Sequence, residues 1–240
     1  MANWDWQVFC KDTIDGELLA NCWGSGGKDI SYLHWMIEAW GWTVAVSLVG
    51  LVIALVVGSL VGVMRTLPNS PWLVRLGNAW VELFRNIPLL VQIFIFYYGL
   101  PSVGIELSPI TAGILTLTLN VAAYMSETLR GSINAVTQGQ WQAGTSLGLT
   151  RDQTLRYVVG PHALRAAVPS LSNSLISLIK DTSLVSVIAV TELMLATKEL
   201  ISTTFQPFPL YLAAAAIYWV LSLSFEQIQR WMEKRVAYPY

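Results

Sequence analysis

The chain has 240 residues, of which 54% are hydrophobic and only 12% are charged. A soluble globular domain carries about 25% charged residues, so this composition excludes an ordinary soluble protein. The apolar residues stand in long blocks, which is typical of an integral membrane protein. The formal net charge of −1 says little about partners, and we expect no nucleic-acid partner.

Five apolar stretches are long enough to cross a hydrocarbon core of about 30 Å. In chain order they are residues 39–64, 86–105, 107–126, 166–191 and 208–225. Only the fourth is interrupted by charge, at Lys180 and Asp181. The sequence therefore predicts an all-α integral membrane protein with five transmembrane helices.

The distribution of lysine and arginine orients these spans, because cytoplasmic loops carry an excess of both. With the N-terminus outside, Lys11, Lys28 and Lys198 lie on the outer side and Lys180 lies within a span. The other ten basic residues then lie on the cytoplasmic side, and they are Arg65, Arg75, Arg85, Arg130, Arg151, Arg156, Arg165, Arg230, Lys234 and Arg235. We therefore predict an outer N-terminus.

Both cysteines, Cys10 and Cys22, lie in the outer N-terminal tail. An oxidising compartment favours a disulfide between them, and two unpaired thiols in a loose tail are the alternative. The same tail contains the stretch GSGGKD, residues 24–29. It departs from a nucleotide-binding P-loop, because Cys22 and Asp29 occupy the positions that require Gly and Ser or Thr. The chain has no other P-loop candidate, so we expect ATP to be hydrolysed by a partner.

The longest polar excursion between spans is TQGQWQAGTSLGLTRDQTLRYVVGP, residues 137–161. Thr137 with Gln140, and Thr150 with Gln153, have the spacing of capping boxes that begin helices. Gly148 between them can adopt the left-handed conformation that ends a helix, and Pro161 is expected to end the second helix. The stretch predicts two short helices joined by a glycine turn on the cytoplasmic side.

The order Gln142-Ala143-Gly144, three residues, Gly148, nine residues, Val158, one residue, Gly160-Pro161 resembles the EAA loop of bacterial ABC-transporter permeases. That loop reads Glu-Ala-Ala, three residues, Gly, nine residues, Ile, one residue, Leu-Pro. The spacing is kept, and Gln142 in place of Glu removes a charge. VELFRNIPLLVQ (81–92) and LIKDTSLVSV (178–187) are similar to signature segments of the polar-amino-acid permeases. The opening NWDWQVF and the ending MEKRV (232–236) are similar to glutamate/aspartate permease subunits.

This resemblance implies the type I ABC importer permease fold and a permease subunit of an ATP-driven importer for polar amino acids. Glutamate and aspartate are the first candidate substrates, and glutamine, cystine or a basic amino acid stay open. It implies residues 1–38 as a periplasmic tail, residues 39–240 as the permease domain, and residues 131–165 as the cytoplasmic coupling loop. The protein is then no enzyme and binds no cofactor or metal. Its partners are a cytosolic ABC ATPase dimer that uses ATP and Mg²⁺, a second permease subunit, and a periplasmic amino-acid-binding protein, all at the bacterial inner membrane. The residues expected to couple to the ATPase are Gln140, Gln142, Ala143, Gly144, Gly148, Leu149 and Pro161.

Lys180 and Asp181 are the most costly residues in the chain, because either at the centre of a span costs about 2.5–3.5 kcal/mol. They are expected to form an ion pair with another span or to line a translocation path. Gln92 fits a hydrogen bond in the path as well as a contact between helices. Glu127 and Arg130 stand three residues apart and are expected to pair. The path candidates are Gln92, Lys180, Asp181, Thr182 and Ser183.

Two other functions stay open at this point. An ion-coupled secondary transporter would need its own ion site and usually shows repeated halves, and no internal repeat is visible. A non-transporting membrane anchor or assembly protein would not need Lys180 and Asp181 inside a span.

Overall fold

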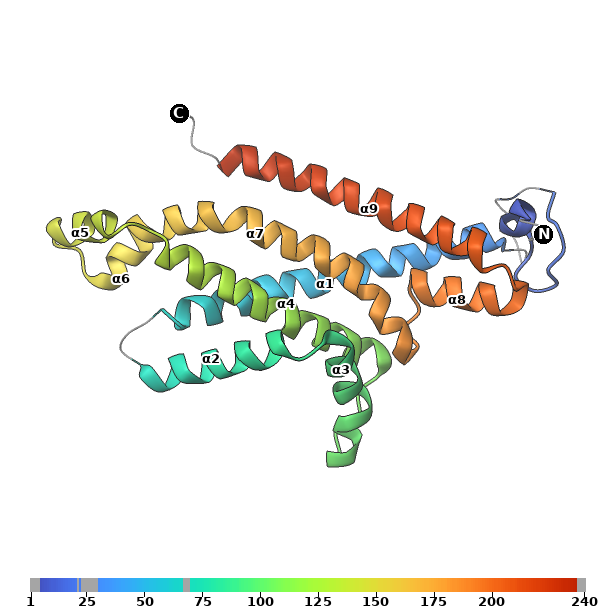
Figure 1. The fold of residues 1–240 in the computed structure, drawn as a ribbon, viewed down its shortest axis with the longest axis horizontal. Helices are drawn as coiled ribbons and strands as arrows, with labels where there is room; N and C mark the ends of the chain where they lie inside the picture. Colours follow the sequence, from blue (N-terminus) through green and yellow to red (C-terminus); the bar gives the residue numbers. More distant parts are fainter. Residues whose placement is uncertain (1–4, 21, 23–29, 67–69, 237–240) are drawn as a thin grey trace.

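The structure is a computed structural model that describes residues 5–20, 22, 30–66 and 70–236 (Figure 1). The stretch 24–29, for which a turn-rich loop is expected, lies outside the described residues. The described part is helical, with isolated β-bridges as its only extended pairing. The α-helices are α1 (Tyr32–Met64), α2 (Pro71–Asn86), α3 (Leu89–Phe94), α4 (Pro109–Asn134), α5 (Gln138–Ser146), α6 (Arg151–Thr154), α7 (Gly160–Asp181), α8 (Leu193–Thr204) and α9 (Pro207–Val236).

Helix α4 lies at the centre of the bundle and packs against α1, α2 and α7. The crossing of α1 and α4 is close because α1 presents glycines there. A Cβ at Gly58 would lie 2.8 Å from the Cβ of Met125 and 2.9 Å from the carbonyl oxygen of Ala122, and one at Gly62 would lie 3.0 Å from that of Ser126. Such a small-xxx-small pattern lets two membrane helices approach through their backbones. The core that results contains Ala54, Val121, Ala122, Met125, Leu129, Ala167, Leu171 and Leu178.

Among the described residues, α1, α4 and α9 are long and apolar enough to cross a membrane, and α2 with residues 89–103 adds a fourth span if this bent pair is counted. These spans confirm a multi-pass helical membrane protein. Helix α7, in the fourth predicted stretch, does not meet the same apolar criterion, because serines and asparagine follow one another along it. The count of five spans stays a prediction.

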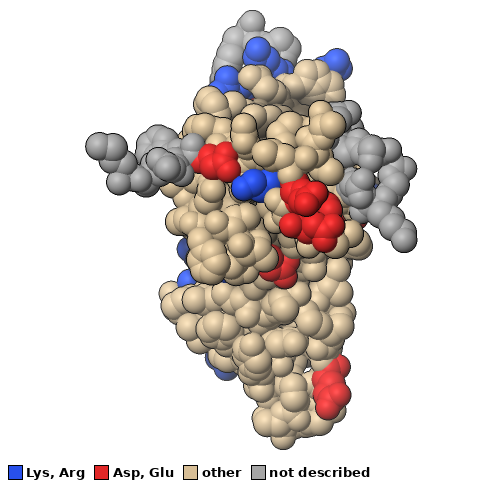
Figure 2. All heavy atoms as spheres, turned by 90° about the vertical axis from the view of Figure 1, so that its right-hand side faces the viewer, with Lys and Arg blue, Asp and Glu red and all other residues tan. Residues whose placement is uncertain are grey.

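The N-terminal tail and α8 lie at one end of the elongated bundle, and α5 with α6 lies at the other (Figure 1). Helix α1 connects the two ends, and its 33 residues correspond to about 50 Å. A tail on the outer side and a hairpin on the cytoplasmic side, as predicted, would have to lie at opposite ends of the bundle, as these two do. Figure 2 views the end with the tail and α8, where acidic groups flank a basic group near the middle of a mostly uncharged surface.

The second predicted span, residues 86–105, corresponds to a helical segment from Leu89 to Val103, and a bend at its start separates it from α2, which corrects the predicted beginning of the span. A helix begins earlier, at the start of α2, and ends at Asn86. Pro88 has no amide hydrogen to continue it, and the chain bends by 106° into α3. After α3 come a π-helical turn (Ile95–Gly99) and a 3-10 turn (Leu100–Val103). Helix α2 lies outside the uncharged stretches because it carries Arg75, Glu82 and Arg85.

The fourth predicted span, residues 166–191, is also divided. Helix α7 ends at Asp181, and a 3-10 helix (Thr182–Ile188) leads to Ala189, whose φ of 59° is left-handed. The chain then enters α8, a helix that the sequence did not predict, and leaves it through Phe205, also left-handed with φ 55°. The last predicted span lies within α9, which continues well beyond it.

The N-terminal tail packs onto one end of the bundle through a short 3-10 helix (Trp6–Cys10). Its Val8 side chain is fully buried and lies in an apolar cluster with α1, α8 and α9 residues. The Asp5 carboxylate accepts hydrogen bonds from the Gln7 backbone N–H and from Lys11, and these contacts lower the pKa of Asp5. The described part of the tail therefore covers this end of the bundle.

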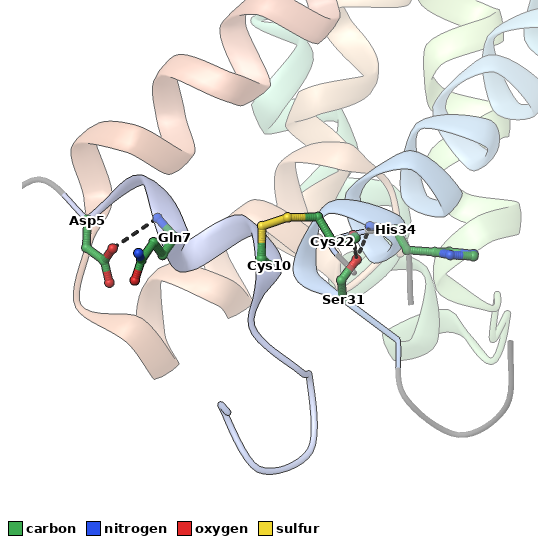
Figure 3. Close-up of a disulfide and its surroundings, with 6 residues drawn as sticks. All are labelled: Asp5, Gln7, Cys10, Cys22, Ser31 and His34. Atoms are coloured by element: carbon green, nitrogen blue, oxygen red, sulfur yellow. Dashed lines mark hydrogen bonds between the residues drawn. A yellow bond between two sulfur atoms is a disulfide. The ribbon is translucent and has the colours of Figure 1, made fainter. Parts of the chain in front are cut away.

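Cys10 and Cys22 form a disulfide in the structure (Figure 3). Beside it, the Ser31 hydroxyl donates to the Cys22 carbonyl at 2.6 Å and accepts from the His34 N–H, which begins α1. The disulfide loop is thus tied to the first residues of α1. That the two cysteines are also oxidised in the cell stays a prediction.

Candidate functional site

A cavity of about 580 Å³ opens where α2 meets α3, beside α4 and α7. The bend between α2 and α3 shapes it, because the residues around Pro88 form one of its walls. The opposite walls come from α4 and from the polar face of α7. Its lining consists of Arg85, Asn86, Ile87, Pro88, Leu89, Asn120, Val121, Tyr124, Asn173, Ser174, Ser177 and Asp181.

One cation and one carboxylate face this cavity, Arg85 of α2 and Asp181 of α7. The Arg85 guanidinium lies over the Tyr124 ring, 5.3 Å from its centroid. Asp181 is half-buried, and the described residues form no ion pair with it or with Lys180. The other lining residues carry neutral amides, hydroxyls and apolar groups. The cavity can therefore receive a small molecule that carries both signs of charge.

The wall at the bend is held by two amide side chains. The Gln92 Nε2 donates to the carbonyl oxygens of Phe84 at 2.8 Å and Ile87 at 2.7 Å, and the Asn120 Nδ2 donates to Phe84 at 2.9 Å. These bonds satisfy carbonyls that the end of α2 leaves without helical partners. Gln92 is only 2% exposed and is not in the cavity lining. Of the two roles predicted for Gln92, the structure therefore shows the contact between helices, here between α3 and the end of α2.

Of the five predicted path residues, only Asp181 lines the cavity. Lys180, one residue earlier, is exposed on another face. The Thr182 hydroxyl donates to the Ile179 carbonyl and that of Ser183 to the Lys180 carbonyl, both at 2.7 Å. These two hydroxyls are thus engaged with the backbone at the end of α7.

The sequence prediction missed Arg85 as a functional candidate and used it only to orient the chain. The sequence does contain a signal for it. Arg85 lies three residues before Pro88, so it is expected at the end of a helix beside an apolar stretch. Asn173, Ser174 and Ser177 are polar residues of the fourth predicted span that are not among the predicted path residues. The structure brings them to the same cavity as Arg85.

The hairpin at the other end of the bundle is built as two helices and a glycine turn. Gly148 has φ of 77°, so the left-handed turn expected there is confirmed. Thr150 and Gln153 form both bonds of a capping box. Thr137 precedes α5 as its N-cap, but its side chain makes no capping bond. The helix therefore begins where the Thr137–Gln140 capping box was predicted, but the predicted capping hydrogen bond of Thr137 is wrong.

The expected end of the second helix at Pro161 is wrong. Helix α6 passes into a π-helical turn (Leu155–Val159), and α7 follows without a break, with Pro161 in its first turn. In this turn the Gly160 N–H donates to the Leu155 carbonyl five residues back. The wider turn shifts the hydrogen-bond register just before Pro161, so the helix continues past a residue that has no amide hydrogen. The hairpin is thus joined rigidly to α7.

The predicted coupling residues have mixed exposure. Gln142, Ala143, Gly148 and Pro161 are exposed, Gln140 and Leu149 are half-buried, and Gly144 is buried. Beside α5 lies a depression of about 670 Å³, with Trp141, Gln142 and Arg151 on its wall. The Arg151 guanidinium lies over the Trp141 ring at 5.4 Å. The hairpin therefore offers an exposed, rigid edge with a hollow beside it.

Known proteins resemble this chain over most of its length. The model of one family, described as the binding-protein-dependent transport system inner membrane component, matches residues 50–238. The chain is similar to the probable amino-acid permease protein YxeN of Bacillus subtilis (strain 168), with 35% identity over 232 residues that cover 95% of this chain and 99% of the relative. It is similar to the glutamine transport system permease protein GlnP of Escherichia coli (strain K12), with 36% identity over 204 residues that cover 84% of this chain and 92% of the relative. Its fold matches the crystal structure of an amino acid ABC transporter with histidines, with a TM-score of 0.80, 32% identity, and coverage of 85% of this chain and 95% of that one.

Proposed function

Because the chain belongs to the family of inner membrane components of binding-protein-dependent transport systems, we propose that it carries a polar amino acid through the cavity between Arg85 and Asp181. The chain is the permease subunit of an amino-acid ABC importer and a multi-pass protein of the inner membrane. ATP hydrolysis belongs to a separate ATPase subunit. The observation that carries the proposal is the pair of opposite charges on one cavity.

An α-amino acid carries an ammonium and a carboxylate two bonds apart, and both lose hydration when it enters a protein. Charges taken from water must be paired, because unpaired burial is costly. The planar guanidinium of Arg85 can donate two parallel hydrogen bonds to the carboxylate. Asp181 can accept hydrogen bonds from the ammonium. One cation and one carboxylate therefore match the zwitterion without excess charge.

The rest of the lining indicates the class of substrate side chain. Asn120, Asn173 and Ser177 offer amide and hydroxyl groups, which suit a neutral polar side chain such as that of glutamine. Glutamate and aspartate are the second candidates, because they carry an additional carboxylate. Lys180 is the cation that would favour them: it does not line the cavity, but it is the chain neighbour of Asp181, is exposed and forms no ion pair with the described residues.

The hairpin is proposed as the contact with the ATPase dimer. Its exposed edge, from Gln140 to Leu149, lies at the end of the bundle away from the tail (Figure 1). The connection of the hairpin to α7 supports a mechanical role, because α5 packs on α6 and the π-helical turn, and these continue into the helix that ends at Asp181. A second permease subunit, identical or related, would complete the path, and a periplasmic binding protein would deliver the amino acid.

Direct binding tests the cavity. The permease–ATPase complex in nanodiscs is incubated with radiolabelled L-glutamine, L-glutamate and L-arginine, without the binding protein. Arg85→Gln and Asp181→Asn are expected to weaken binding at least tenfold, because each leaves a substrate charge unpaired. Arg230→Gln, which removes an exposed ion pair with Glu226, is the control and should bind normally. Wild-type affinity in both cavity variants of an intact complex would refute the proposal.

Lys180→Ala separates the two substrate classes. It is expected to weaken L-glutamate binding and leave L-glutamine binding unchanged if Lys180 serves an acidic side chain. Equal, unchanged affinities for both would remove glutamate and aspartate from the proposal. Loss of assembly in this variant would instead indicate a structural role for Lys180.

Crosslinking tests the hairpin. A cysteine at Gln142, in a chain whose native cysteines are replaced by serine, is paired with cysteines along the surface groove of the ATPase. A crosslink is expected in at least one nucleotide state, and a cysteine at Thr203, at the opposite end of the bundle, should form none. Absence of any crosslink in every state would contradict the coupling role.

A further inference from the structure

Glu127 of α4 is the centre of a cluster of three arginines next to the cavity. Its carboxylate lies 2.8 Å from the Arg65 guanidinium, forms a close ion pair with Arg130, and lies 4.0 Å from Arg85. The pair with Arg130 confirms the spacing argument from the sequence. The contact with Arg65, 62 residues earlier in the chain, could be seen only in the tertiary structure.

The three arginines are held to different degrees. The Arg65 side chain is 6% exposed, and it also donates to Asn78 at 2.7 Å and to Ser126 at 3.2 Å. Arg130 forms two hydrogen bonds to Glu127. Arg85 is 39% exposed and makes its single long contact with the same carboxylate. Arg85 is therefore the partner that can leave most easily.

The position of Arg85 connects the cluster to the cavity. Asn120, Tyr124 and Glu127 are spaced by four and three residues, so they lie along one face of α4. The first two line the cavity, and the third is the centre of the cluster. Arg85 lines the cavity, covers Tyr124 and contacts Glu127. It stands at the boundary between the two sites.

We propose that Glu127 is a positioning residue for Arg85, and that its carboxylate competes with the carboxylate of the transported amino acid for this guanidinium. With the cavity empty, Arg85 turns toward Glu127. A bound amino acid takes the guanidinium, and its return to Glu127 favours release. The inference rests on the proposed function, because it requires Arg85 to bind substrate.

The charges of the cluster explain why such a competitor would be weak. Arg65 and Arg130 already offset the single negative charge of Glu127, so little attraction remains for Arg85. A strong competitor would exclude the substrate, whereas a weak one permits binding and still favours release. It follows that Arg130 acts against the competition: it keeps Glu127 occupied and leaves Arg85 available to the amino acid.

The test uses two variants that break the same ion pair and are expected to act in opposite directions. Glu127→Gln removes the competitor, so the nanodisc complex should bind radiolabelled L-glutamine or L-glutamate about three- to tenfold more tightly, with slower release. Arg130→Gln frees Glu127 to hold Arg85, so the same complex should bind more weakly by a similar factor. A tenfold change corresponds to about 1.4 kcal/mol. A pair that only stabilises the fold would shift both affinities in one direction.

The Arg85→Gln background provides the control. Both effects should vanish there, because the shared guanidinium is gone. Effects that persist in this background, or that share one direction, would overturn the inference. If Arg85→Gln weakens binding and the opposite shifts are absent, only the role of Glu127 fails. If Arg85→Gln itself binds normally, the proposed function fails together with this inference. Should Glu127→Gln not assemble, Glu127→Asp withdraws the carboxylate from Arg85 and is expected to tighten binding to a smaller extent.

Discussion

Gly144→Ala is the sharpest perturbation of the hairpin that the structure offers. Gly144 is buried in α5 and faces Thr154 of α6. An added Cβ would lie 2.4 Å from the Cγ2 of Thr154 and 2.7 Å from its Oγ1. Ordinary contacts between carbon atoms are about 3.5–4.0 Å, so α5 must move by roughly 1 Å or the helices must separate. The EAA pattern has Ala at this position, so sequence similarity alone predicts that the change is tolerated.

The magnitude follows from two opposing effects. Replacing Gly by Ala inside a helix stabilises it by about 0.8–1.0 kcal/mol. Overpacking of a close contact costs about 1–3 kcal/mol. The difference between the two is a net local loss of about 0–2 kcal/mol, and the short contacts of 2.4 Å and 2.7 Å place it toward the upper end. Such a loss displaces α5 without unfolding the bundle, because the core around α4 lies elsewhere. Thr154→Ala should rescue the variant, since it removes both close atoms and since the Thr154 hydroxyl has no hydrogen-bond partner in the described structure.

Hydrogen exchange measures the effect directly. In the nanodisc complex, the amides of α5 in Gly144→Ala should exchange about tenfold faster for each 1.4 kcal/mol lost. ATP hydrolysis that depends on transport should fall. Gly139→Ala on the same helix is the matched control, because its Cβ would meet no atom closer than 4.0 Å, and it should protect α5 equally or better. Normal protection in Gly144→Ala, or no rescue by Thr154→Ala, would refute the reasoning.

Three further outcomes are expected. Gly148→Val should destabilise the turn by about 1–2 kcal/mol, because its φ of 77° is costly for a β-branched residue; the protein should insert but lose coupled ATP hydrolysis, and normal transport would contradict this. Tyr218→Phe removes the O–H that donates at 2.7 Å to the fully buried Glu192 carboxylate, so thermal unfolding should show a loss of about 1–3 kcal/mol, and an unchanged midpoint would count against it. Cys10 and Cys22 should react with maleimide only after reduction, and full labelling without reductant would exclude the disulfide.

Local chemistry explains which predictions succeeded. The membrane class follows from composition, and the turn at Gly148 and the cap at Thr150 depend on residues within four positions of one another. The Glu127–Arg130 pair has the same local origin. Pro161 shows the limit of such reasoning, because a proline ends a regular α-helix and the π-helical turn before it removes the conflict. In that turn the Gly160 N–H donates to the carbonyl five residues back, whereas a regular α-helix would use the carbonyl four residues back.

The sequence by itself determined the membrane class, the helical hairpin and the polar character of α7, because each depends on composition or on neighbours along one helix. Only the tertiary structure decided which polar groups face the cavity. Arg85 and Asp181 are 96 positions apart in the chain. They line the same cavity because the chain bends by 106° between α2 and α3 and because α2 and α7 both pack on α4. Gln92 was a candidate for the path from its position in an apolar stretch. Because of the same bend, its amide instead donates to the carbonyl oxygens of Phe84 and Ile87. Packing between helices, which no single stretch encodes, separates the side chains that face the cavity from those that support its wall.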